Sequence, residues 1–262
     1  MRVVFTAHNI RLDNGILTKP ERGHDMDAYP WFVSARRILE TVFPVDRSKI
    51  RVADLGCLEG GYAVGFARLG FRVLGLEVRA ANFQACAYVK ANTSLPNLEF
   101  VQDDAWNIAR YGKFDAVFCC GLLYHLDRPK RFLDLLASVT TRLLILQTHF
   151  ATDAVSSKFG PSELVENEGL LGRWYTEFAA DDAVANREAR KWASWGNHKS
   201  FWIKREHLLQ AIHDAGFDLV LEQFDGLGDD IAGSLTSGYY KTHERGTFIG
   251  IKTGVRSSRV QT

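Results

Sequence analysis

Apolar residues follow two alternating periodicities along the middle of this chain. From residue 51 to residue 147, short apolar runs typical of buried strands are separated by stretches in which apolar residues recur at helical spacing. Such alternation indicates right-handed βαβ units, and therefore a parallel sheet covered by helices on both faces. The predicted strands are residues 51–55, 72–76, 98–102, 114–119 and 142–147, and the predicted helices are residues 61–69, 80–92 and 129–139.

The two ends of the chain extend this core. Asn14 and Gly15 lie between short β-compatible runs, which indicates a hairpin or an extended flap because both residues tolerate a positive φ. Apolar residues return at helical spacing from Tyr29 to Phe43. After Phe150 the alternation is interrupted, and it resumes only near the C-terminal end. The later predicted elements are a helix at residues 204–215 and strands at residues 217–224 and 247–252.

The pattern predicts an α/β protein with a doubly wound, mostly parallel seven-stranded sheet. Ligands of such a sheet bind beyond the carboxyl ends of its strands. We expect a single domain over residues 1–262. Its predicted segments are an N-terminal hairpin and helix (1–49), a cofactor-binding core (50–150), an insertion after strand five that forms a substrate lid (151–203), and a final helix with two strands (204–253).

Composition is that of an ordinary folded protein. The 262 residues carry 32 Lys and Arg against 31 Asp and Glu, a formal net charge of +1 that gives no general attraction for nucleic acid. No apolar run reaches the roughly 20 residues of a membrane helix, and the first residues are too polar for a secretory signal. We therefore expect a cytoplasmic protein without membrane insertion or nucleic-acid partner; its oligomeric state stays open.

Glycines and acids mark the ends of the first four predicted strands. Glycine permits tight turning and close approach of a ligand to the backbone, and the start of a helix offers unpaired N–H groups. An acid after a strand can accept hydrogen bonds from ribose hydroxyls or from an adenine amino group. The residues concerned are Gly56, Gly60 and Gly61 after strand one, Glu77 after strand two, Asp103, Asp104 and Ala105 after strand three, and Cys120 and Gly121 after strand four.

These four segments, in this order, resemble the class I S-adenosylmethionine-dependent methyltransferases. The resemblance covers residues 50–150 well and residues 204–253 loosely. It implies a Rossmann-like methyltransferase fold, S-adenosylmethionine as the cofactor and a methyl-transfer reaction. One position departs from the family pattern, because Leu58 stands where the middle glycine of the turn is usual. We expect the geometry of that turn to differ accordingly.

The resemblance also implies which residues hold each part of the cofactor. In that family the first turn holds the methionine part, the acid after the second strand holds the ribose, and an acid after the third strand holds the adenine. The corresponding residues here are Asp54, Gly56 and Gly60 for the methionine part, Glu77 for the ribose, Asp104 with Asp103 as the alternative beside Ala105 for the adenine, and Cys120 and Gly121 beside the sulfonium.

Two histidines are candidates for the base that removes a proton from a hydroxyl acceptor. His125 follows the fourth strand and His149 ends the fifth, so we expect both to face the cofactor edge of the sheet. His125 also has a structural interpretation, because it precedes a helix that Asp127 would cap and Pro129 would begin. His149 has no such interpretation, so it is the preferred candidate.

The insertion is rich in aromatic residues. It contains Trp174, Trp192, Trp195 and Trp202, four of the six tryptophans. Flat amphipathic rings suit an acceptor with apolar faces and hydroxyls, such as a sugar or a hydroxylated lipid, and the alternative is that they pack the insertion onto the sheet. Eight acids against six bases between residues 151 and 200 argue against a phosphate-rich acceptor. The candidate substrate contacts are Trp195, His198 and Trp202.

The sequence leaves open two other functions and the presence of a bound metal ion. The segment from Gly121 to His125 is similar to one in enzymes that modify the wobble uridine of transfer RNA, and a chain of this fold could also bind the cofactor without catalysis. Some sugar O-methyltransferases use Mg²⁺ to orient two hydroxyls and lower their pKa. The candidate metal ligands, among which sequence spacing does not select, are Glu166, Glu168, Asp229 and Asp230.

Overall fold

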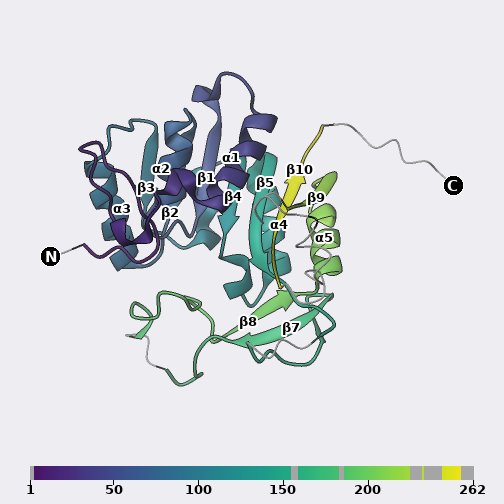
Figure 1. The fold of residues 1–262 in the computed structure, drawn as a ribbon. Helices are drawn as coiled ribbons and strands as arrows, with labels where there is room; N and C mark the ends of the chain where they lie inside the picture. Colours follow the sequence, from purple (N-terminus) through teal and green to yellow (C-terminus); the bar gives the residue numbers. More distant parts are fainter. Residues whose placement is uncertain (1–2, 155–158, 183–185, 225–231, 233–243, 255–262) are drawn as a thin grey trace.

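A seven-stranded sheet forms the centre of the computed structural model (Figure 1). The structure describes residues 3–154, 159–182, 186–224, 232 and 244–254. The strand order is β3-β2-β1-β4-β5-β10-β9, in which β10 runs antiparallel to β5 and β9 while the other neighbours are parallel. This is the predicted doubly wound, mostly parallel sheet. Its strands are β1 (Arg51–Leu55), β2 (Arg72–Leu76), β3 (Leu98–Val101), β4 (Phe114–Cys120), β5 (Thr140–His149), β9 (Leu219–Gln223) and β10 (Arg245–Ile251).

Helices cover both faces of the sheet, as the alternating pattern predicts. On one face α1, α2 and α3 bury Phe32, Phe66 and Val89, and on the other face α4 and α5 bury Phe132 and Ile212. Within the described residues, no helix is both long enough and apolar enough to cross a bilayer. The helices are α1 (Pro30–Val42), α2 (Gly61–Arg68), α3 (Ala80–Ala91), α4 (Pro129–Val139) and α5 (Arg205–Asp214), with short 3-10 turns η1 (Pro20–Arg22), η2 (Met26–Ala28), η3 (Arg47–Lys49), η4 (Ala105–Tyr111) and η5 (Leu123–His125).

The order of the strands reverses between β1 and β4. Both strands run parallel to each other and to β2, so the loops that leave their carboxyl ends diverge to opposite sides and open a crevice between them. The loops after β2 and β3 reach the same edge of the sheet. A ligand site is therefore expected at this edge, where the marked glycines and acids lie.

The insertion adds a second, three-stranded antiparallel sheet. It consists of β6 (Val165–Asn167), β7 (Leu170–Thr176) and β8 (Lys199–Ile203) in that order. In Figure 1 this sheet lies below the main sheet, beside the end of β5. The backbone N–H of Phe201 donates to the carbonyl of Leu126, at 2.8 Å, which joins β8 to the segment after β4. The segment between β7 and β8 is thereby brought to the carboxyl edge.

Three local features differ from the sequence expectation. The N-terminal hairpin is reduced to a single antiparallel bridge between Arg11 and Leu17. Strand β5 continues to His149, because β10 pairs with it along its whole second half. The prediction that Asp127 caps α4 is wrong: the N–H groups of Lys130 and Arg131 donate to the carboxylate of Glu168, at 2.9 and 3.3 Å. The insertion therefore supplies the cap of that helix.

Candidate functional site

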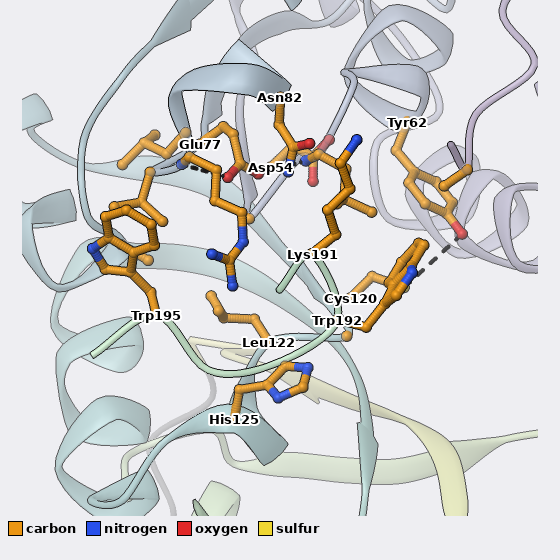
Figure 2. A pocket seen from close by; sticks show the side chains of 18 of the residues that line it. Asp54, Tyr62, Glu77, Asn82, Cys120, Leu122, His125, Lys191, Trp192 and Trp195 are labelled. Carbon is orange, nitrogen blue, oxygen red and sulfur yellow. Dashed lines mark hydrogen bonds between the residues drawn. The ribbon is translucent and has the colours of Figure 1, made fainter. Parts of the chain in front are cut away.

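A cavity of about 490 Å³ lies at the carboxyl edge of the sheet, where the strand order reverses. Its walls come from the loops after β1 to β4, from the N-terminal segment around His8 and from residues 191–197 of the insertion. Figure 2 shows Asp54, Glu77 and Asn82 on one side and His125 on the other. Eight of the nine predicted cofactor residues line this cavity, and Gly60 does not. The eight are Asp54, Gly56, Glu77, Asp103, Asp104, Ala105, Cys120 and Gly121.

The turn after β1 depends on three residues with positive φ. These are Gly56 at 66°, Leu58 at 52° and Gly60 at 81°. Leu58 occupies the left-handed region in which a side chain is usually strained, by about 1–3 kcal/mol. Its N–H donates to Glu77 Oε2 at 2.9 Å, and its carbonyl accepts a hydrogen bond from the thiol of Cys86 at 3.0 Å. The surrounding contacts therefore hold this leucine in the conformation that a glycine adopts readily.

Glu77 presents a fixed carboxylate at the end of β2. It is 5% exposed, and its Oε1 accepts a hydrogen bond from the N–H of Arg79 at 2.8 Å while Oε2 accepts the one from Leu58. Burial raises the pKa of Glu77, and these two backbone bonds counteract that rise. Each carboxylate oxygen can accept a further hydrogen bond. The group can therefore bind two adjacent hydroxyls, such as those of a ribose.

Asp54 is a buried acceptor that lacks a full set of partners. It is 2% exposed, and no described residue hydrogen-bonds to its Oδ2. Burial raises the pKa of Asp54 to about 8, although the backbone amide of Ala63 lowers it; the nearby Glu77 raises it further. An unpaired buried acceptor costs about 1–3 kcal/mol. A ligand with a cationic donor, such as an ammonium group, would relieve that cost.

The two acids after β3 have different roles in the structure. Asp103 accepts hydrogen bonds from the side chains of Asn107 and Tyr111, at 2.7 and 2.8 Å, and from the N–H of Asp104. Asp104 accepts one bond, at Oδ1, from the N–H of Trp106 at the start of η4. Asp103 is thus committed to holding η4 in place. Of the two acids, Asp104 therefore keeps a carboxylate oxygen that can accept a hydrogen bond from a ligand.

Cys120, at the end of β4, lies among polar side chains. Its sulfur is 3.6 Å from Gln147 Oε1 and 3.9 Å from the hydroxyl of Tyr62. Arg245 donates to the same oxygen of Gln147 at 2.8 Å. Burial raises the pKa of Cys120 to about 11, and Arg245 lowers it. The thiol is therefore protonated near neutral pH and is a poor nucleophile, so Cys120 contributes to the cavity only as a lining residue.

His125 forms a buried pair with a carboxylate of the insertion. Its Nδ1 lies 2.8 Å from Oε1 of Glu177, whose side chain is 1% exposed. The other carboxylate oxygen accepts a hydrogen bond from the N–H of Ser194 at 3.0 Å, and the side chain of Asn197 donates to the carbonyl of His125 at 2.9 Å. When Nδ1 donates to the carboxylate, Nε2 is left as an acceptor. The arrangement can act as an oriented base.

His149 and Trp202 lie behind the wall of the cavity and are not among the residues that line it. The two rings stack at a centroid distance of 4.7 Å, and Nδ1 of His149 is 3.0 Å from the carbonyl of Glu244. Trp202 is 3% exposed, and its Nε1 donates to the carbonyl of Tyr124. His149 lies at the predicted edge of the sheet, at the end of β5. However, the side chains of His149 and Trp202 pack together in an aromatic cluster.

Residues 191–197 of the insertion close one side of the cavity. Arg79, which is 5% exposed, anchors this segment: its guanidinium donates to the carbonyls of Arg187 and Ala193 and lies 5.1 Å from the ring of Trp195. Figure 2 shows Trp195 and Glu77 among the residues that line the cavity. Trp195 therefore lines the cavity against Arg79, two residues after Glu77.

His198, the third predicted substrate contact, is elsewhere. It is exposed and lines a second cavity of about 370 Å³ together with Trp174 and Lys199, which adjoins the first at Asp127 and Asn197. The structure therefore brings together Trp195 and the predicted cofactor residues, and it does not bring His198 to them.

The predicted metal ligands form no site in the part of the chain that the structure describes. Within it, no group of three or more His, Cys, Asp or Glu side chains could hold a metal ion. Glu168 is occupied as the cap of α4, and Glu166 is exposed on β6. Asp229 and Asp230 lie outside the described residues.

Sequence reasoning did not single out Glu177 or Arg79. Glu177 is one of eight acids in the insertion, and its partner His125 is 52 residues away, so no spacing connects them. Arg79 had a weak signal, because it follows the marked acid Glu77 by two residues. A basic residue so close to a candidate ligand group is worth examining in any chain of this pattern.

Comparison with known proteins identifies one family over most of the chain and relatives over about a third of it. A family model described as "Methyltransferase domain" matches residues 28–222. A protein of Geobacillus sp. (strain WCH70) that is named as a methyltransferase is 35% identical over 82 residues, and the mitochondrial ubiquinone biosynthesis O-methyltransferase of Dictyostelium discoideum is 31% identical over 101 residues. These matches span 30% and 34% of this chain, and about a third of the length of each relative, 33% and 32%.

A solved structure shares the fold. The N-terminal domain of EvdMO1, determined in the presence of SAH and D-fucose, is 24% identical with a TM-score of 0.62. The similarity covers 86% of this chain and 83% of that one. At this identity the likeness concerns the arrangement of the elements.

Replacement of Asp54 by Asn should change how stability depends on pH. The pKa of Asp54 is about 8 when folded and near 3.8 when unfolded, so between these values the folded state holds an extra proton and stability falls as pH rises. Asp54→Asn removes this loss and can still accept the Ala63 amide. We expect urea unfolding without ligand to show the variant at least about 1 kcal/mol more stable at about pH 8, with little gain at about pH 4. A variant of unchanged or lower stability at the higher pH would contradict this.

Proposed function

We propose an acceptor for this chain, which belongs to the methyltransferase-domain family and is a class I S-adenosylmethionine-dependent methyltransferase. The proposed acceptor is a hydroxyl of a small molecule, either a sugar or a hydroxylated lipid. The observation that carries this proposal is the pair of His125 and Glu177 at the cavity, 2.8 Å apart. A hydroxyl with a pKa far above neutrality reacts poorly until it loses its proton. A positioned base is therefore the feature that this class of acceptor requires.

The polar groups of the cavity fit the cofactor. S-adenosylmethionine, when bound, supplies an electrophilic methyl group on its sulfonium. Glu77 would accept the ribose hydroxyls, Asp104 the adenine amino group, and Asp54 the ammonium of the methionine part. Cys120 and Gly121 would lie beside the sulfonium. The unpaired Oδ2 of Asp54 supports this assignment, because a buried carboxylate without a donor calls for a cationic ligand group.

His125 would act as the base in this proposal. Its Nε2 would accept the hydroxyl proton of the acceptor, while Glu177 holds Nδ1–H and stabilises the imidazolium that forms. The carboxylate oxygen that faces Ser194 is already bonded, so Glu177 has one fixed orientation. His149 is not used, because its ring is stacked on Trp202 and does not line the cavity.

The aromatic side chains of the cavity support a small acceptor with flat apolar faces. Tyr29, Tyr62, Tyr124 and Trp192 line the cavity, and Trp192 is 62% exposed. Such rings pack against the C–H faces of a sugar or against a hydrocarbon ring, and their polar ends can bond to hydroxyls. We therefore assign to Trp192 the substrate contact that the sequence analysis assigned to Trp202.

The two histidines are distinguished by single substitutions. We expect His125→Ala to lower kcat by about 10²–10⁴-fold with the affinity for S-adenosylhomocysteine almost unchanged, because it removes the base and leaves the cofactor contacts. His149→Ala is the matched control, which should reduce stability through the aromatic cluster and leave kcat within about tenfold. The measurements are turnover and calorimetry on folded variants. The opposite pattern would place the base at the end of β5.

A screen for methyl transfer tests the class of acceptor. We expect mass detection with methyl-labelled S-adenosylmethionine to reveal a product among sugars or hydroxylated lipids, with acceptor binding that changes little as salt rises. Transfer RNA that bound through several phosphates would instead lose affinity steeply with salt. A labelled transfer-RNA product would contradict the proposed acceptor. Cofactor affinity without any product would favour a silent binding protein.

A further inference from the structure

Hydrogen bonds hold the N-terminal segment against the turn that follows β1. The carboxylate of Glu59, which is fully buried, accepts hydrogen bonds from the hydroxyl of Thr6 at 2.7 Å and from the N–H groups of Ala7 and His8 at 3.1 and 2.7 Å. A buried carboxylate with several donors is a strong anchor. This anchor fixes the backbone of His8 beside the cavity, although 51 residues separate it from Glu59.

The ring of His8 has a defined tautomer. The N–H of Gly61, the first residue of α2, donates to His8 Nδ1 at 3.0 Å, so Nδ1 is an acceptor. A neutral imidazole that accepts at Nδ1 carries its proton on Nε2. Burial lowers the pKa of His8 to about 4; Glu59 raises it and Arg22 lowers it, so the ring is neutral near pH 7. His8 therefore offers one N–H donor, at Nε2.

The Nε2–H donor of His8 lies at the cavity. His8 is 5% exposed and lines the cavity, and no described residue hydrogen-bonds to its Nε2. The ring is tightly placed, because a Cβ at Gly61 would come within 2.8 Å of its Cγ, and the ring of Tyr62 meets it edge-on at 5.4 Å. The glycine at position 61 thus serves to admit this ring. A buried donor held so firmly indicates a ligand acceptor in front of it.

A second unsatisfied group lies in the same cavity with the opposite polarity. Oδ2 of Asp54 is a buried acceptor without a described partner. Arg22 also lines the cavity, close enough to lower the pKa of His8 by its charge. The first N–H groups of α2, beside His8, add a partial positive charge. A negative group is favoured near His8 and Arg22, and a positive group near Asp54.

An α-amino acid carries both of these groups on one carbon. We propose that His8 binds the carboxylate of the methionine part of S-adenosylmethionine through Nε2–H, while Asp54 receives its ammonium. This inference rests on the proposed use of that cofactor and assigns a contact to a residue outside the four strand-end segments. His8 would be a binding residue that orients the sulfonium by holding the far end of the cofactor.

Two ligands that differ in the amino-acid part test this role. S-adenosylhomocysteine has the carboxylate and ammonium, and 5′-methylthioadenosine has neither. We expect calorimetry of His8→Phe to show an affinity for S-adenosylhomocysteine that is about 10- to 100-fold lower, with the affinity for methylthioadenosine unchanged within about twofold. His213→Phe is the matched control, since that exposed ring on α5 does not line the cavity; it should change neither affinity.

The possible outcomes separate this inference from the proposed function. Equal loss of both affinities in His8→Phe would show a purely structural role, and no loss would show no role; either result overturns the inference while the proposed function stands. If the unaltered chain bound neither ligand, the proposed function would fail as well. In the unaltered chain, the Nε2–H proton resonance of His8 should move downfield with S-adenosylhomocysteine and stay in place with methylthioadenosine. Equal movement with both ligands would also overturn the inference.

Discussion

The hydrogen bond between His125 and Glu177 is the contact on which the proposed chemistry depends. His125 comes from the end of β4, and Glu177 comes from the insertion. A carboxylate that is 1% exposed is stable only when its oxygens have donors, and these donors are the imidazole and the N–H of Ser194. The insertion must therefore pack against the core before the base is oriented. The proposed chemistry therefore needs both the core and the insertion.

A second buried charged group, the guanidinium of Arg79, joins the insertion to the end of β2. Arg79 follows Glu77 at the end of β2, and its guanidinium reaches the carbonyls of Arg187 and Ala193 in the insertion. The same short segment thus presents an acid to the cavity and a cation to the insertion. Because both groups are buried, displacing the lid would leave a guanidinium without its acceptors, which is costly. The position of the insertion is therefore coupled to the segment that carries Glu77, for which we propose the ribose contact.

The sheet and the cavity-lining residues at the ends of β1 to β4 were predictable because their signals are local. Strands β1 to β5 are apolar runs covered on both faces; Glu77 directly follows β2, and Asp104 comes three residues after the end of β3. The acceptor side was not predictable in this way. A strand end locates the edge of the sheet but does not orient the side chain, and β10 pairs its Arg245 with His149, whose ring stacks on Trp202. Glu177 has no local signal, because only the folded insertion brings it to His125.

The protonation of the His125 ring nitrogens tests the proposed base most directly. In the neutral ring, ¹⁵N NMR should show the proton on Nδ1, donated to Glu177, and an unprotonated Nε2. Glu177→Gln, whose amide can donate to Nδ1, should move the proton towards Nε2. A native ring that is protonated at Nε2 and bare at Nδ1 would contradict the assignment, because the base would then lack its acceptor nitrogen.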